Sequence, residues 1–248
     1  MNERLSTADA ELLPDIFRQW FAARGWAPRP HQLRLLEIAE AGRSVLLIAP
    51  TGAGKTLAGF LPSLVELLQK KGQGLHTLYI SPLKALAVDI KRNLETPIAE
   101  MGLDVSVETR TGDTPQNRRL RQRQSPPDIL MTTPEQLALL LSYPDAEKFF
   151  GTLSCVVLDE LHALANSKRG DLLALGLARL DKLSPGLRRV GLSATVAEPD
   201  ELRRYLMPQP VGGEALAEIV TAPPGAAPEL SILTPAGPEP AQIGRAHV

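Results

Sequence analysis

Residues 45–56 decide the fold, and they read Val45-Leu46-Leu47-Ile48-Ala49-Pro50-Thr51-Gly52-Ala53-Gly54-Lys55-Thr56. The first half is a short apolar run rich in branched residues, which is typical of a strand buried on both faces. The second half is a glycine-rich loop, and residues 56–69 after it have helical spacing. Glycines let a backbone turn tightly, so that its N–H groups converge on phosphate oxygens. A strand, such a loop and a helix in this order predict a phosphate-binding loop.

The loop also offers the side chains that hold a nucleotide. The backbone N–H groups of residues 51–54 and the positive end of the following helix would surround the phosphates. Lys55 would reach the β- and γ-phosphates of ATP, and Thr56 would offer a hydroxyl to Mg²⁺. Ala49 stands where the G-x-x-x-x-G-K-[ST] pattern has its first glycine. For the loop taken alone, a chance glycine-rich turn is the alternative.

Strand-like and helix-like stretches alternate along the rest of the chain. Further strands are predicted at 77–81, 105–109, 128–132, 154–159 and 188–193. Helices are predicted at 9–25, 32–41, 83–101, 115–124, 134–141, 172–183 and 199–206. Alternating strands and helices imply right-handed βαβ crossovers. The sequence therefore predicts an α/β fold with a mainly parallel central sheet and helices on both faces.

Composition narrows the class of protein. The 248 residues are 44% hydrophobic and 22% charged, which excludes a disordered or fibrous chain. No apolar run approaches the ~18 residues of a membrane span, and no signal-peptide core opens the chain, so we expect a cytoplasmic protein without a membrane partner. Cys155 is the single cysteine, which excludes an internal disulfide. The net charge of −1 argues against a strongly basic nucleic-acid coat but leaves a local basic groove open.

A second apolar strand ends in two acids, Asp159 and Glu160. Ligands of an open parallel sheet bind at the carboxyl ends of its strands, so these acids should face the same edge as Lys55. Asp159 can hold Mg²⁺, and Glu160 can accept a proton from an attacking water. Solvated turn acids are the alternative. His162 follows these acids. It is better suited to a polar connection between them and the rest of the domain than to a role as a metal ligand.

Motifs in one order carry a family resemblance. Residues 49–56, Asp159 to His162 and Ser193-Ala194-Thr195 resemble motifs I, II and III of superfamily 2 helicases, in which motif I commonly begins with alanine. Asp-Glu-x-His marks the DExH branch. Four further stretches are similar to the large helicase-related (Lhr) family, in particular its bacterial branch linked to DNA ligase and DNA repair. They are Ser81-Pro82-Leu83-Lys84-Ala85-Leu86, Arg110-Thr111-Gly112-Asp113-Thr114, Thr132-Thr133-Pro134-Glu135 and Lys168-Arg169-Gly170-Asp171.

The resemblance implies a RecA-like P-loop lobe that uses ATP and Mg²⁺ for 3′ to 5′ movement on single-stranded DNA. Gln32 would read the adenine edge, because an amide donates and accepts at once; a surface amide at a helix start is the alternative. Trp26 would be the aromatic partner of the base, with Phe21 and Trp20 as alternatives. The family links nucleotide state to nucleic-acid grip through Ser193 and Thr195.

Three loops after strands are suited to phosphates, and the family places them on the tracked strand. Their candidate contacts are Ser81, Pro82 and Lys84, then Arg110, Thr111, Gly112 and Asp113, then Thr133 and Pro134. Thr133 is expected at a helix cap with Pro134 in the first turn. A basic run either holds DNA backbone or forms a solvated face; it consists of Arg118, Arg119, Arg121 and Arg123. For Lys168 and Arg169 we favour contact with DNA or with another lobe.

We expect residues 1–206 to form the first motor lobe, with its upstream helices. Residues 207–242 would be a linker, since six of the 22 prolines lie between Thr221 and Val248. Residues 243–248 resemble a translated sequencing adapter and are expected to be non-native. No motif IV, V or VI follows, so the chain should lack the second RecA-like lobe with its arginine fingers and turn over ATP poorly alone.

Other partners and functions remain as alternatives. A DNA ligase or a repair nuclease is a possible protein partner, and RNA could replace DNA as the tracked strand. A module that binds ATP and nucleic acid without turnover is the competing function from a different class. A small-molecule kinase is disfavoured, because Gln32 and Ser193-Ala194-Thr195 would have no role in it.

Overall fold

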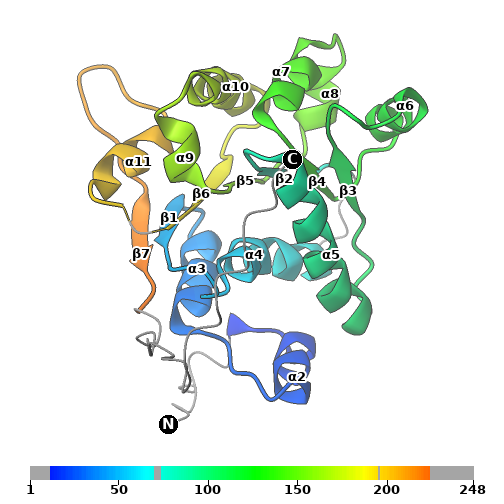
Figure 1. Ribbon diagram of the computed structural model, residues 1–248, viewed down its shortest axis with the longest axis vertical. Helices are drawn as coiled ribbons and strands as arrows, with labels where there is room; N and C mark the ends of the chain where they lie inside the picture. Colours follow the sequence, from blue (N-terminus) through cyan, green and yellow to red (C-terminus); the bar gives the residue numbers. More distant parts are fainter. Residues whose placement is uncertain (1–11, 70–73, 195, 224–248) are drawn as a thin grey trace, which may run out of the picture.

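The computed structural model describes residues 12–69, 74–194 and 196–223, and only the backbone of residues 84–89. Its centre is a seven-stranded sheet in the order β3-β4-β2-β5-β6-β1-β7 (Figure 1). All its pairings are parallel, as the alternation of strands and helices predicts. The strands are β1 (Val45–Ile48), β2 (Thr77–Ile80), β3 (Val107–Arg110), β4 (Ile129–Thr132), β5 (Cys155–Leu158), β6 (Arg188–Ser193) and β7 (Glu218–Thr221).

Helices cover both faces of the sheet, which confirms the predicted fold class. One face packs against α2 (Asp15–Ala23), α3 (Pro30–Glu40), α4 (Lys55–Gln69) and α5 (Lys84–Glu100). The other face packs against α7 (Pro134–Ser142), α8 (Ala146–Phe150), α9 (Leu161–Ala165), α10 (Lys168–Leu183) and α11 (Pro199–Tyr205). A further helix, α6 (Gln116–Gln124), hydrogen-bonds to edge strand β3 through Gln122.

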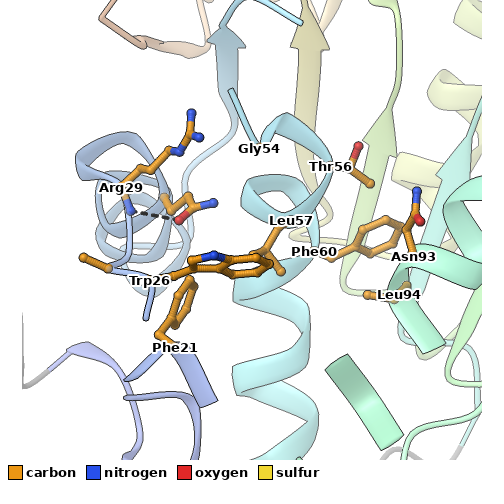
Figure 2. A pocket seen from close by; sticks show the side chains of 11 residues that line it. Phe21, Trp26, Arg29, Gly54, Thr56, Leu57, Phe60, Asn93 and Leu94 are labelled. Carbon is orange, nitrogen blue, oxygen red and sulfur yellow. Dashed lines mark hydrogen bonds between the residues drawn. The ribbon is translucent and has the colours of Figure 1, made fainter. Parts of the chain in front are cut away.

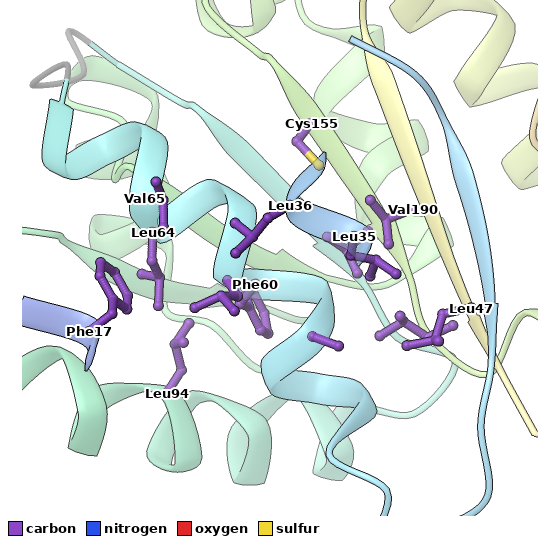
Figure 3. Close-up of a cluster of buried hydrophobic side chains, with 14 of the residues drawn as sticks. Phe17, Leu35, Leu36, Leu47, Phe60, Leu64, Val65, Leu94, Cys155 and Val190 are labelled. Atoms are coloured by element: carbon purple, nitrogen blue, oxygen red, sulfur yellow. The ribbon is translucent and has the colours of Figure 1, made fainter. Parts of the chain in front are cut away.

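Strand β1 shows how the sequence produces two cores. Successive side chains of a strand point to opposite faces. Accordingly Val45 and Leu47 join the cluster beneath α3 and α4, which Figure 3 shows, while Leu46 and Ile48 join the cluster on the other face. All four are buried. An uninterrupted apolar run is therefore the correct signal for a strand covered on both sides.

The structure extends the lobe beyond the predicted boundary at residue 206. Strand β7 lies inside the expected linker and pairs in parallel with β1, with Val45 opposite Glu218. Residues 218–221 carry only a weak strand pattern, because β7 is an edge strand in which Val220 is the one buried residue. Residues 224–242 and the expected tail 243–248 lie outside the described residues. Within the described ranges, no helix has the length and apolar character to cross a membrane.

Local signals explain the helix boundaries that differ from expectation. Helix α10 begins at Lys168, four residues before the predicted start, because the hydroxyl of Ser167 accepts a hydrogen bond from the N–H of Gly170 (3.1 Å). Helices α8 and α9 have five residues each, which is too short for a helical period to stand out. The other predicted strands and helices agree with the structure to within a few residues where it describes them.

Two leucine truncations should separate the core from the surface. We expect Leu47→Ala to lower the free energy of unfolding by about 2–5 kcal/mol, because it leaves a cavity under α3 and α4. Leu175→Ala removes the same atoms from a side chain that is 72% exposed, and should change it by less than about 0.5 kcal/mol. Urea unfolding followed by circular dichroism measures both. Equal effects would contradict the placement of Leu47 in the core.

Candidate active site at the carboxyl edge of the sheet

The loop after β1 has the shape that its glycines predict. Gly52 and Gly54 have φ angles of 78° and 74°, in the left-handed region that other residues seldom adopt. A Cβ atom on Gly54 would also lie 3.1 Å from the side-chain nitrogen of Gln32. Lys55 begins α4, and its ammonium group donates to the carbonyl of Ala49 (2.7 Å). The loop therefore folds back over its own lysine at the start of the helix.

Asp159 and Glu160 lie at the same edge of the sheet. The N–H of Asp159 donates to the carbonyl of Ile80 (2.9 Å), which continues the β2–β5 ladder past the end of β5. Glu160 has φ 46° and ψ 45°, and it is the only non-glycine residue with a positive φ in the described ranges. Such a backbone is strained by about 1–3 kcal/mol and is retained mainly at functional sites. The turn directs two neighbouring carboxylates to the edge that carries Lys55.

Burial makes the ionised form of Asp159 costly. Burial raises the pKa of Asp159 and the Glu160 carboxylate raises it further, while Tyr79 and Lys55 act in the opposite direction. Tyr79 is buried beside Asp159, and burial followed by the charge of Asp159 raises the pKa of the phenol. No Lys or Arg of the described chain forms an ion pair with Asp159. A divalent cation would supply the missing positive charge, so the site suits one.

A polar chain connects the acids to strand β6. The ring nitrogen Nε2 of His162 lies 3.5 Å from a carboxylate oxygen of Glu160, and Nδ1 lies 3.1 Å from the hydroxyl of Ser193. Ser193 is fully buried, and its carbonyl accepts from the N–H of Ala49 (3.0 Å). The structure thus brings together the three segments that the sequence singled out. Thr195 lies outside the described residues.

A pocket with a volume of about 450 Å³ opens beside the glycine loop (Figure 2). Gln32 is 3% exposed, so the alternative of a surface amide is wrong. Its side-chain oxygen accepts from the N–H of Arg29 (2.9 Å), and its nitrogen faces Gly54. Residues of several elements line the pocket: Phe21, Trp26, Ala27, Arg29, Gln32, Gly54, Thr56, Leu57, Phe60, Asn93 and Leu94.

Trp26 is the most exposed of the aromatic side chains that line the pocket, with 54% of its surface exposed. Trp20 lies behind it, with ring centroids 5.9 Å apart, and donates its indole N–H to Glu100 (2.7 Å). The guanidinium of Arg24 lies about equally far from both rings, at 5.1 and 5.0 Å, and also binds Glu100. Trp26 and Phe21 thus line the pocket, while Trp20 supports them. No sequence pattern indicated the contact between Arg24 and Glu100, because these residues lie 76 residues apart.

Two of the three phosphate-suited loops begin helices as expected. Helix α5 begins at Lys84, after Ser81 and Pro82, and Ser81 is fully buried with its hydroxyl donating to the carbonyl of Leu83 (3.3 Å). Thr133 occupies the cap position of α7 and Pro134 its first position. The hydroxyl of Thr133 makes no capping hydrogen bond. The predicted cap position is confirmed, and the Thr133 side chain leaves the first N–H groups of α7 without a capping hydrogen bond.

The third loop is held from inside by arginines. Arg110 is 1% exposed, its guanidinium donates to the carbonyl of Arg119 (3.1 Å), and burial lowers its pKa. Its guanidinium is therefore bonded within the protein, whereas the sequence predicted a contact with phosphate. Arg119 donates to the carbonyls of Thr111 (3.1 Å), Gly112 (2.6 Å) and Thr114 (2.7 Å). Within the loop, the N–H of Asp113 donates to the hydroxyl of Thr111 (3.3 Å).

The rest of the basic run also serves the fold. Arg118 and Arg121 both pair with Glu108, at 3.1 and 2.6 Å. Arg123 pairs with Asp145 (2.6 Å) and lies 3.9 Å from the ring centre of Tyr143. Neither a free DNA-binding stripe nor a purely solvated face describes these residues. Their partners come from other elements, so helical spacing alone could not reveal them.

Proteins of similar sequence are helicases. A protein-family model for DEAD/DEAH box helicases matches residues 29–202. An Lhr helicase/probable uracil glycosylase of Mycolicibacterium smegmatis is 42% identical over 234 residues, which are 89% of this chain and 15% of that relative. An ATP-dependent helicase Lhr-Core protein 2 of Thermococcus barophilus is 40% identical over 212 residues, which are 79% of this chain and 24% of the relative.

Solved structures show the same fold. The structure of Mycobacterium smegmatis helicase Lhr bound to ssDNA and AMP-PNP matches with a TM-score of 0.79 and 42% identity, over 88% of this chain and 28% of that one. The helicase MrfA bound to DNA matches with a TM-score of 0.72 and 28% identity, over 86% of this chain and 30% of that one. The likeness confirms the predicted RecA-like lobe. The chain spans only 15 to 30% of the length of these four proteins.

The ion pair between Glu135 and Arg169 predicts a pH dependence of stability. Hydrogen bonding to Arg169 is the main cause that lowers the pKa of Glu135 from 4.5 to about 2. Because the folded-state pKa lies below the unfolded one, the stabilisation is present above pH 4.5 and is lost as the pH falls through about 2. Both side chains are partly exposed, so solvent limits it to about 1 kcal/mol or less.

Urea midpoints of the wild type and Glu135→Gln measure this contribution. We expect Glu135→Gln to be the less stable protein at pH 7, and the two midpoints to converge as the pH falls below 4.5. A gap that stays constant down to acid pH would contradict the assignment of the ion pair.

Proposed function

The chain belongs to the DEAD/DEAH box helicase family, and on this premise we propose that it is the first motor lobe of an Lhr-type helicase. In this proposal, ATP hydrolysis drives 3′ to 5′ movement along single-stranded DNA, and the helicase takes part in DNA repair. One observation carries it: Lys55, Asp159, Glu160 and Ser193 converge at one edge of the sheet, beside a pocket lined by Gln32. Relatives several times longer support a second RecA-like lobe as its partner.

The glycine loop is proposed to hold the phosphates of ATP. In this proposal the phosphates lie against the N–H groups of residues 51–54 and the start of α4. The ammonium group of Lys55 leaves the carbonyl of Ala49 and binds phosphate oxygens instead. Gln32 reads the edge of the adenine while Trp26 stacks on its face. Thr56 and Asp159 would hold Mg²⁺. This ion neutralises charge on the transferring phosphate when bound.

Glu160 is the proposed base for the attacking water. Its backbone places the carboxylate at the sheet edge next to Asp159, where it can accept a proton. His162 contacts both Glu160 and Ser193. Loss of the γ-phosphate beside Glu160 could therefore shift Ser193 at the end of β6 through this histidine. Ser193 and Thr195 complete this coupling role in the proposal. The second lobe would supply arginine fingers, which is why the chain alone should turn over ATP poorly.

The nucleic acid is proposed to lie along the loops after β2, β3 and β4. Their backbone N–H groups, together with Ser81, Lys84, Thr111 and Thr133, contact phosphates without reading bases. The Lhr structure with ssDNA and the MrfA structure with DNA support DNA as the strand. A DNA ligase or a repair nuclease is the proposed protein partner. RNA is the alternative strand and is decided by the experiment below.

Lys55→Ala should abolish most nucleotide affinity of the chain. Isothermal titration with AMP-PNP and Mg²⁺ is expected to show a loss of about tenfold or more, because a charge-assisted contact to phosphate is removed. Lys182→Ala is the matched control, since Lys182 lies in the last turn of α10. Unchanged affinity in Lys55→Ala would count against the phosphate-binding loop.

A longer chain that adds the second lobe tests the motor function. We expect its ATPase rate to rise with single-stranded DNA more than with RNA of the same sequence, and Glu160→Gln to lower the stimulated rate by at least about 100-fold. The 248-residue chain should show little turnover under the same conditions. Robust DNA-stimulated turnover by the short chain would refute the need for a second lobe. Stronger stimulation by RNA would favour the alternative strand.

A further inference from the structure

Arg169 connects two loops that are far apart in the sequence. Its Nε and Nη2 atoms donate to the two carboxylate oxygens of Glu135, the second at 3.1 Å, and Nη1 donates to the carbonyl of Pro82 (2.6 Å). The planar fork of a guanidinium suits such bidentate contacts, and a lysine cannot reproduce them. Glu135 lies 34 residues before Arg169 in the chain, and Pro82 lies 87 residues before it.

These partners belong to two of the proposed phosphate-binding loops. Pro82 precedes the start of α5, and Glu135 is the second residue of α7. The strands before the loops, β2 and β4, are neighbours, and the N–H of Ser81 donates to the carbonyl of Thr132 (3.0 Å). One side chain therefore fixes the separation of two adjacent helix starts.

The start of α10, which carries Arg169, is itself fixed to α9. A Cβ atom on Gly170 would lie 2.2 Å from the carbonyl oxygen of Leu164, so only glycine allows this approach. Ser167 donates to the carbonyl of Leu164 (2.7 Å), and the hydroxyl of Tyr205 donates to the carbonyl of Gly170 (2.6 Å). Helix α9 directly follows Glu160. Arg169 is thus attached to the segment that carries the acid pair.

We propose that Arg169 is a positioning residue for nucleic-acid binding. It fixes the loops at Pro82 and Glu135 relative to each other and to the acid pair, Asp159 and Glu160. This inference rests on the proposed function and deepens it. It also changes the role expected from the sequence, since the three contacts of the guanidinium are made to the protein rather than to DNA. Both side chains are charged at neutral pH, and the lowered pKa of Glu135 extends the ion pair to more acid pH.

Removing either partner should weaken the grip if Arg169 acts by positioning. We expect Arg169→Gln and Glu135→Gln each to weaken the affinity of the 248-residue chain for a single-stranded oligonucleotide by about tenfold. The double variant should lose no more than about one single variant loses, because both changes break the same connection. Arg169→Lys keeps the charge without the fork and should fall between the wild type and Arg169→Gln. Fluorescence anisotropy over a range of KCl concentrations measures all four.

A direct phosphate contact by Arg169 would give a different pattern. The slope of log affinity against log salt would shrink by about 0.7 in Arg169→Gln, and Glu135→Gln would bind more tightly because a negative charge is lost. Positioning predicts an unchanged slope and weaker binding for Glu135→Gln. The direct-contact pattern, or unchanged affinity in both variants, would overturn the inference.

The controls separate this inference from folding and from the proposed function. Arg204 and Glu214 form an ion pair elsewhere, so Arg204→Gln and Glu214→Gln should leave affinity unchanged. AMP-PNP binding reports that each variant is folded; should Arg169→Gln fail this check, Glu135→Gln and Arg169→Lys decide the outcome. A wild-type chain that binds neither DNA nor RNA would overturn the proposed function. Wild-type binding with unaffected variants would overturn this inference alone.

Discussion

The register of the parallel sheet is the constraint on which the site depends. Ile80 lies opposite both Leu158 and Thr132, so β2, β4 and β5 end at one level. Leu158 lies opposite Gly191 and Ile48 opposite Ser193, so β6 and β1 end together, two residues further along the same edge. Each loop that follows carries a different chemical group, from the glycine loop to the acid pair. A shift of one strand by one residue would reverse its buried faces and move its loop out of reach. Successive side chains of each strand pack into opposite cores, and this packing fixes the register of the sheet. The same packing therefore brings the loops of the site together.

Arginines connect the loops that the sheet brings to its edges. Arg119 holds the carbonyls of the loop after β3, Arg169 joins the loops after β2 and β4, and Arg24 supports Trp26 beside the pocket. A guanidinium can make several directed hydrogen bonds and stay charged while partly buried. Basic residues that would look like a nucleic-acid surface in a sequence thus bind largely to the protein itself and fix the shape of these loops. The near-neutral net charge is consistent with this pairing.

Particular elements show why some features could be predicted and others could not. The run 45–48 and the strand ending at Asp159 carry apolar patterns long enough to predict buried strands, and both were found within about a residue. Strand β7 has a single buried residue and depends on pairing with β1, so its own pattern was too weak. The arginine run 118–123 was ambiguous because Glu108 and Asp145 lie on other elements. Ion pairs between distant segments leave no periodic signal.

The sequence by itself determined the class of fold, the glycine-rich loop before α4, the acids Asp159 and Glu160 at a strand end, and the order of the motifs. These depend on short-range patterns: apolar periodicity, glycines at a tight turn, and acids at a strand end. Only the tertiary structure decided that Gln32 is buried against Gly54, that Arg110 is buried and bonded to Arg119, and that Arg169 binds Glu135 and Pro82. These facts depend on which strands become neighbours, because hydrogen bonds and burial act between residues close in space, whatever their distance along the chain.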